Sequence, residues 1–70
     1  MKAEEVVLIG AVGAGVGAVV HGKFGVSTGN AMFDAVIGAG IAVLGWYLDY
    51  DGAADFIEGF GVGYFMDSVL

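Results

Sequence analysis

Glycine and alanine recur every three or four residues through the long apolar segments of this chain. In residues 31–45 the small residues are spaced by 4, 3, 4 and 3 positions, which places them on one stripe of a helix. Large residues form a second stripe with the same period, whereas a strand would alternate with a period of two. Such stripes let two helix backbones approach closely. The predicted helix-packing positions are Gly10, Gly13, Ala14, Gly17, Ala31, Ala35, Gly38, Ala42 and Gly45.

Two polar breaks, residues 21–30 and 49–52, divide the chain into three apolar segments. The first break ends in Ser-Thr-Gly-Asn, which supplies N-cap candidates for a following helix. We therefore predict an all-α fold in a single small hydrophobic helical domain, residues 1–70. A hydrophobic helical hairpin of residues 4–21 and 30–49, packed small stripe against small stripe, precedes a shorter third helix or interfacial segment over residues 53–69. The GFGVGYF stretch of that third segment alternates glycine with larger residues, so a strand is the alternative there.

Composition indicates that the apolar surface faces lipid, identical neighbours or both. Hydrophobic residues make up 59% of the chain and charged residues only 14%, against roughly 25% in ordinary soluble domains. The first two segments lie at the short end of the length that spans a bilayer, about 17–25 apolar residues. A soluble protein with an unusually apolar face is the alternative. Lys2 and residues 6–20 are typical of a signal peptide, but no small-x-small cleavage site follows, so we expect this segment to be retained.

The charge balance excludes some partners. Two lysines, no arginine and a net charge of −6 argue against nucleic-acid binding by direct basic contact and against docking of a basic face on anionic lipid. The acidic bias, with Gly, Ala and Val favoured over Leu and Ile, suggests a GC-rich archaeal source adapted to salt. The chain contains no cysteine, so neither a disulfide nor a thiolate metal site can form.

Polar and aromatic side chains at the segment ends suggest surface roles. Trp46, Tyr47 and Tyr50 are predicted interfacial anchors, because Trp and Tyr favour the membrane–water boundary. Asp51, Asp55 and Glu58 share one face if the third segment is helical, and this acidic face is solvated, binds cations or lines a lumen. His21 is the only histidine, and nothing near it in sequence completes a site, so we expect an interfacial polar residue.

The opening stretch VVLIGAVGAGVGAVV has an alternative interpretation as a dinucleotide-binding strand and phosphate loop. Residues 13–18 fit the G-x-G-x-x-A variant of that motif. The fold requires further strands with helices on both faces, which 70 residues of this composition do not supply. The glycines are better explained by helix packing. No catalytic set, cofactor-binding motif or metal-ligand spacing is present, so we predict no enzyme, no cofactor and no metal, with bound lipid as the remaining ligand.

GAGVG followed by HGK and TGNAM resembles the proton-carrying ring subunit of rotary ATPases over residues 10–32. That resemblance implies a two-helix hairpin with a carboxylate at mid-span of the second helix. The polar loop typical of the family is absent here. Asp34 and Asp49 lie at the ends of the second segment, with no acid between them. Ion translocation is therefore not our leading hypothesis.

In size and pattern, Glu4 to Tyr50 resembles two families of membrane-derived subunits: conjugative pilins and the coat proteins of spindle-shaped archaeal viruses. Both are small two-helix hydrophobic chains, and the pilins carry a short polar loop with a lysine and often assemble with lipid. The resemblance implies a structural subunit of a homopolymeric pilus, filament or virion coat. Its partners would be itself and membrane lipid, and its location a membrane or an extracellular particle derived from one. The alternatives are a small pore-forming or ion-conducting protein, such as a holin or ring subunit, and an accessory subunit of a larger membrane complex.

Overall fold

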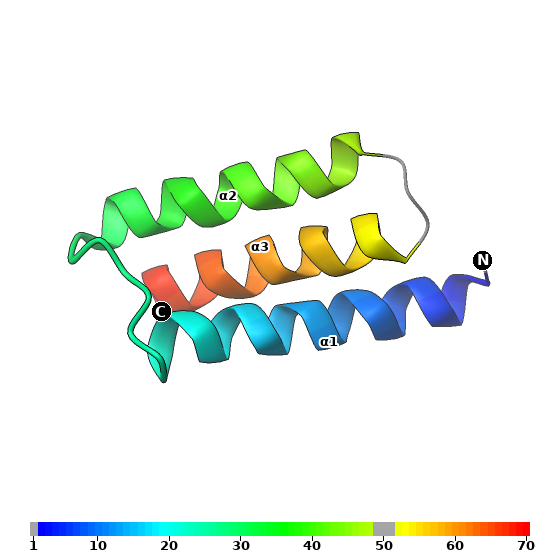
Figure 1. Ribbon diagram of the computed structural model, residues 1–70, viewed down its shortest axis with the longest axis horizontal. Coiled ribbons are helices and arrows are strands. Elements are labelled where there is room, and N and C mark those ends of the chain that lie inside the picture. Colours follow the sequence, from blue (N-terminus) through cyan, green and yellow to red (C-terminus); the bar gives the residue numbers. More distant parts are fainter. Residues whose placement is uncertain (1, 49–51) are drawn as a thin grey trace.

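The computed structural model describes residues 2–48 and 52–70, which form three helices and no strand. Helix α1 runs over Ala3–Gly22, α2 over Ala31–Tyr47 and α3 over Ala53–Val69. The predicted all-α fold is confirmed, and the alternating GFGVGYF stretch is helical. Helix α3 lies between the other two (Figure 1), in a layer measuring 37 × 21 × 16 Å.

The small stripes of α1 and α2 meet α3 and not each other. The expected stripe-to-stripe packing of the first two helices is therefore wrong. Helix α2 runs antiparallel to α3, so these two consecutive helices form the closely packed hairpin, while α1 lies parallel to α3 on its opposite side (Figure 1). The third helix is the centre of the layer and not an appendage to it.

Alternate glycines on α3 make this arrangement possible. Two residues of an α-helix turn through about 200°, so glycines at every second position point to opposite sides. A Cβ atom at Gly63 would lie 2.7 Å from the Cα of Ala14 in α1, and one at Gly59 would lie 2.9 Å from the Cα of Gly10. A Cβ atom at Gly61 would instead lie 2.8 Å from the Cα of Ala42 in α2. The period of two that suggests a strand thus belongs to a helix packed between two others.

The predicted packing positions on α1 and α2 supply the matching surfaces. A Cβ atom at Gly17 would lie 2.9 Å from the carbonyl carbon of Phe60, and one at Gly38 would lie 2.8 Å from the Cα of Phe65. Gly13 and Gly45 are also buried against backbone of α3, Ala35 is buried, and Gly10, Ala14 and Ala42 are partly buried. Ala31 is exposed and takes no part in this packing.

The layer carries its small residues inside and its large apolar residues outside. Among the described residues, the buried apolar side chains are Ala35, Ala54 and Tyr64. Large aliphatic and aromatic side chains on both outer helices are exposed. Val7, for example, is 71% exposed and Trp46 is 74% exposed. The hydrophobic effect in water stabilises the opposite distribution. This fold is therefore held by close van der Waals contact of backbones, as in membrane helices.

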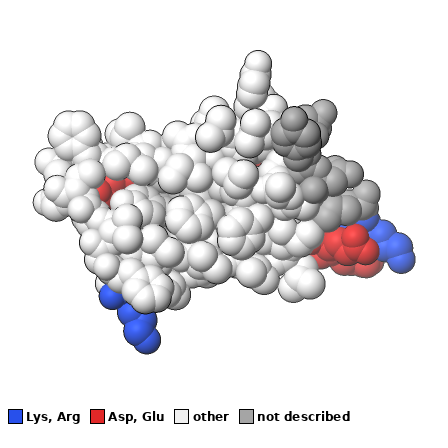
Figure 2. Space-filling view, in the orientation of Figure 1, with Lys and Arg blue, Asp and Glu red and all other residues white. Residues whose placement is uncertain are grey.

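Charged side chains gather near the two ends of the long axis, and a broad uncharged surface separates them (Figure 2). We call residues 6–20, 35–48 and 59–66 the apolar band, because they contain no Asp, Glu, Lys, Arg or His. Helix α1 has 20 residues and is long and apolar enough to cross a membrane. Trp46 and Tyr47 are exposed at one end of the band, where interfacial anchors are expected. Tyr50 lies outside the described residues.

Two glycines two residues apart on α1, and so on opposite sides of the helix, distinguish close packing from simple helix propensity. We expect Gly17→Ala to lower the free energy of unfolding by about 1–3 kcal/mol, because its Cβ would collide with rigid backbone of α3. Gly15→Ala is the matched control, since a Cβ there meets nothing within 4 Å. That change should leave stability unchanged or raise it by up to about 1 kcal/mol. Denaturation in detergent, followed by circular dichroism, measures both; equal effects would contradict the packing.

Candidate functional site

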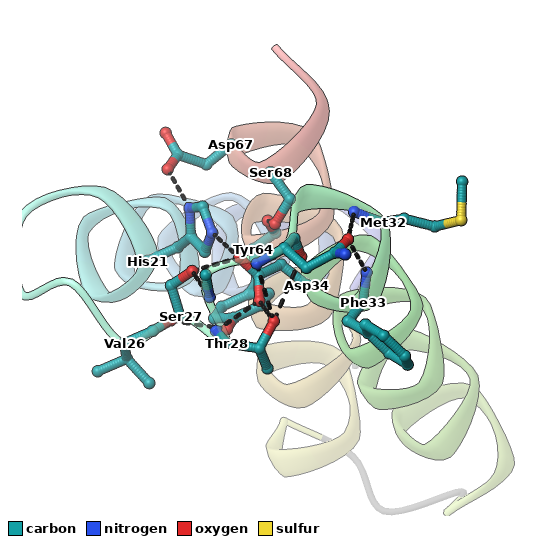
Figure 3. Close-up of polar contacts among 12 residues, drawn as sticks. His21, Val26, Ser27, Thr28, Met32, Phe33, Asp34, Tyr64, Asp67 and Ser68 are labelled. Carbon is teal, nitrogen blue, oxygen red and sulfur yellow. Dashed lines mark hydrogen bonds and ion pairs between the residues drawn. The ribbon is translucent and has the colours of Figure 1, made fainter.

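A polar cluster forms where the loop between α1 and α2 passes the C-terminal end of α3. Because α1 and α2 lie on opposite sides of α3, this loop, residues 23–30, must cross from one to the other. Glycines with positive φ, Gly25 at 67° and Gly29 at 84°, supply its turns. Asn30 then caps α2 by accepting a hydrogen bond from the Met32 N–H at 2.9 Å. The crossing brings side chains from all three helices together (Figure 3).

Asp34 is the centre of this cluster, and the residue as a whole is only 2% exposed. Its Oδ1 accepts hydrogen bonds from the backbone N–H and the hydroxyl of Thr28, at 2.8 and 2.7 Å. Its Oδ2 accepts from the Ser27 hydroxyl and from His21 Nε2, the latter at 2.9 Å. Asp34 also sits in the first turn of α2, where the helix dipole favours a negative charge. A buried carboxylate is tolerated here because four donors surround it.

His21, in the last turn of α1, joins two carboxylates from two different helices. Its Nε2 meets Asp34 of α2, and its Nδ1 lies 2.5 Å from Oδ2 of Asp67 in α3 (Figure 3). Carboxylates only accept hydrogen bonds, so an imidazole that bonds to both must carry a proton on each nitrogen. The two distances therefore fit the doubly protonated form of His21, which alone can donate to both carboxylates.

Tyr64 completes the cluster by packing against the imidazole ring of His21. Its ring meets that of His21 edge to face, with centroids 4.8 Å apart. Its hydroxyl donates a hydrogen bond of 2.6 Å to the carbonyl of Val26, which fixes the crossing loop to α3. Tyr64 is the one large side chain in the buried set, and it reaches from the apolar band to the polar end.

The hydrogen bonds shift both titrating groups toward their charged forms. The pKa of His21 is raised above its ordinary 6.5, chiefly by the hydrogen bond to Asp67 and next by the one to Asp34. The pKa of Asp34 is lowered well below its usual range, mainly by the Ser27 hydroxyl and then by the Thr28 N–H. These groups lie beyond the apolar band, at the end of the helix layer.

The arrangement can hold a proton and tie three helix ends together, but it does not build a nucleophile. The Ser27 hydroxyl donates to Asp34 and not to the imidazole, and the lowered pKa of Asp34 makes that carboxylate a weak base. Among residues 2–48 and 52–70, no group of three or more His, Asp or Glu side chains is arranged to hold a metal ion.

The predicted acidic face lies at the opposite end of the layer. Asp55 and Glu58 border a groove of about 160 Å³ between α1 and α3, which Val6, Gly10 and Val62 also line. Glu58 is exposed and Asp55 partly buried. Asp51, the third member of this face, lies outside the described residues, as does Asp49. The structure thus separates Asp55 and Glu58 from the polar cluster by the length of the apolar band.

Sequence reasoning missed the polar cluster. It treated His21 as a residue without partners, because Asp34 and Asp67 are 13 and 46 positions away. A usable signal was present: Ser27, Thr28 and Asp34 bracket the start of α2 with capping residue types. Only the crossing of the loop over α3 shows that Asp34, which Ser27 and Thr28 surround, meets the histidine. Comparison with protein-family models, with curated proteins and with solved structures finds no match for this chain.

The shifted pKa values predict a stability maximum in mildly acidic solution. The His21 contribution is complete below pH 6.5 and is lost as pH rises through the higher pKa of the folded state. The Asp34 contribution is complete above pH 3.8 and is lost as pH falls through the lower folded-state pKa. We expect the melting temperature in detergent to be highest between these limits and to fall on the alkaline side. His21→Gln should remove that alkaline fall, and an unchanged profile in this variant would assign it to another group.

Proposed function

We propose that this protein is a structural subunit of a homopolymeric assembly derived from a membrane, such as a filament, pilus or virion coat. The observation that carries the proposal is the distribution of side chains, with glycine and alanine inside the helix layer and large apolar residues outside. A monomer with this surface would expose large contiguous apolar patches to water, which soluble monomers avoid. The outer surface must therefore be covered by lipid, by other copies or by both.

The shape of the layer suggests that other copies of the chain cover part of its apolar surface. Helices α1 and α2 each use one side on α3, and their remaining sides carry exposed apolar residues along the whole apolar band. Val7, Leu8 and Val12 line one edge and Val36 and Val43 the other. Two unlike apolar edges on one chain suit head-to-tail contacts, which generate rings or open filaments by repetition.

A pore-forming role is the second candidate, and Glu58 favours it. This residue stands exposed about 8 Å from the start of α3, beyond the first helical turn. A carboxylate that borders the apolar band is costly if it faces lipid, and carboxylates within membranes mark water-filled pathways. Copies arranged with their α1–α3 grooves inward would place Glu58 and Asp55 along a wet lumen.

Imaging tests the proposal directly. We expect the native protein, extracted in mild detergent, to form regular filaments or shells of this one chain in negative-stain electron microscopy. Val43→Asn, on an exposed edge of α2, should reduce assembly without loss of helicity, because it puts a polar group into the copy-to-copy contact. Val26→Asn is the matched control, since Val26 is similarly exposed but lies in the polar loop.

Other outcomes would redirect the assignment. Absence of any ordered polymer, with or without added lipid, would contradict the structural role. Small rings together with liposome leakage that disappears in Asp55→Asn or Glu58→Gln would establish the pore. Stable co-purification with a different, larger chain would indicate an accessory subunit.

A further inference from the structure

The two carboxylates that hold His21 differ in how strongly they depend on it. Asp34 has a side chain that is 3% exposed and is held by three donors besides the imidazole. Asp67 has a side chain that is 37% exposed, and the hydrogen bond to His21 is the one that the structure records for it. Water can replace the imidazole at Asp67 but has little access to Asp34.

Loss of one proton from the imidazole forces a choice between these two bonds. A neutral imidazole has one N–H donor and one lone pair. Keeping the proton on Nε2 preserves the bond to the buried Asp34, where an unpaired charge would be most costly. The lone pair of Nδ1 then faces the carboxylate of Asp67 at a distance suited only to a hydrogen bond, so the two groups repel.

We propose that His21 is a pH-sensitive latch, which holds the C-terminal end of α3 to the end of α1 while doubly protonated and releases Asp67 when it gives one proton to solvent. The latch joins helices that are not consecutive in the chain, and it lies at the end where α3 terminates. Release frees only this end, because the glycine contacts of α1 with α3 hold the rest of the interface.

Three groups face the imidazole, whose protonation sets the state of the latch. Asp34 faces it from α2, and Asp67 and the Tyr64 ring face it from α3. Lys23 follows two residues later at the start of the loop. The pKa of His21 is raised, so the transition falls above pH 6.5. Gly22 leaves space for the latch, because a Cβ there would lie 2.9 Å from Oδ2 of Asp67.

Nuclear magnetic resonance of the single histidine in detergent micelles tests the protonation step. We expect both ring nitrogens of His21 to stay protonated above pH 6.5 in the unmodified chain, and the surviving proton at higher pH to be on Nε2. Asp67→Asn should move the midpoint downward, since it removes the carboxylate that contributes most to the shift. Because Asp67 is exposed, this variant should keep its helical circular dichroism.

Distances between spin labels test the release. The chain has no cysteine, so a pair introduced at Val19 and Val69 is unique and reports on the latch end of α1 and α3. We expect its distance distribution to broaden or lengthen as His21 titrates, and to be insensitive to that pH range in His21→Gln. A control pair at Val7 and Ala53, at the other end of the same helices, should not change.

Three results would overturn the latch. One is a His21 midpoint at or below 6.5 in the unmodified chain, and another is a midpoint that Asp67→Asn leaves in place. The third is a Val19–Val69 distance that stays constant through the titration. The protonation state and the label distance are both measured within one chain, so the outcome does not depend on whether the protein forms a polymer.

Discussion

The contact between helix backbones at the glycines of α3 determines the rest of this structure. Gly59 and Gly63 admit α1 on one side, and Gly61 admits α2 on the other. The gain comes from many weak dispersion contacts between atoms at close range, and not from removing large apolar side chains from water. Those side chains are therefore left on the outside of the layer.

The position of α3 also explains the polar cluster. With α3 in the middle, the chain must leave α1, cross the layer and start α2 on the far side. The crossing loop brings Ser27 and Thr28 to the carboxylate of Asp34, which also bonds to His21, and it brings the carbonyl of Val26 to the hydroxyl of Tyr64. Packing in the apolar band and hydrogen bonding at its end are thus two consequences of one topology. The hydrogen bonds of the cluster link the three helices at this end of the layer, beyond the glycine contacts.

The helices were predictable from sequence and their arrangement was not. The spacing of small residues in α1 and α2 predicts helices, and Asn30 is the N-cap of α2 as the Ser-Thr-Gly-Asn run suggested. The stripe, however, says only that a close neighbour exists and not which helix it is. Gly59, Gly61 and Gly63 held the missing information, because alternate glycines in a helix require neighbours on two opposite sides. The same pattern also suits a strand, and helix periodicity was weakest there.

The candidate site could not be predicted from the sequence, for a different reason. His21, Asp34 and Asp67 carry no local motif, and their partnership depends on the loop crossing over α3. The burial of Asp34 could not be predicted either. Asp34 is a single acid in the first turn of an apolar helix, and exposed carboxylates are also common at that position. By contrast, composition alone anticipated the apolar exterior, because 14% of charged residues cannot cover a small chain.

The most direct test of the account is the environment of the exposed apolar residues. Single nitroxide labels at Val12, Ile37, Val43 and Val62, in protein reconstituted with lipid, would report collision rates with oxygen, which enters apolar surroundings, and with a nickel chelate, which stays in water. If the large residues face lipid or other copies, all four labels should exclude the nickel chelate, and a label at Val26 in the polar loop should admit it. Nickel access at the four positions equal to that at Val26 would show a water-exposed surface and contradict the account.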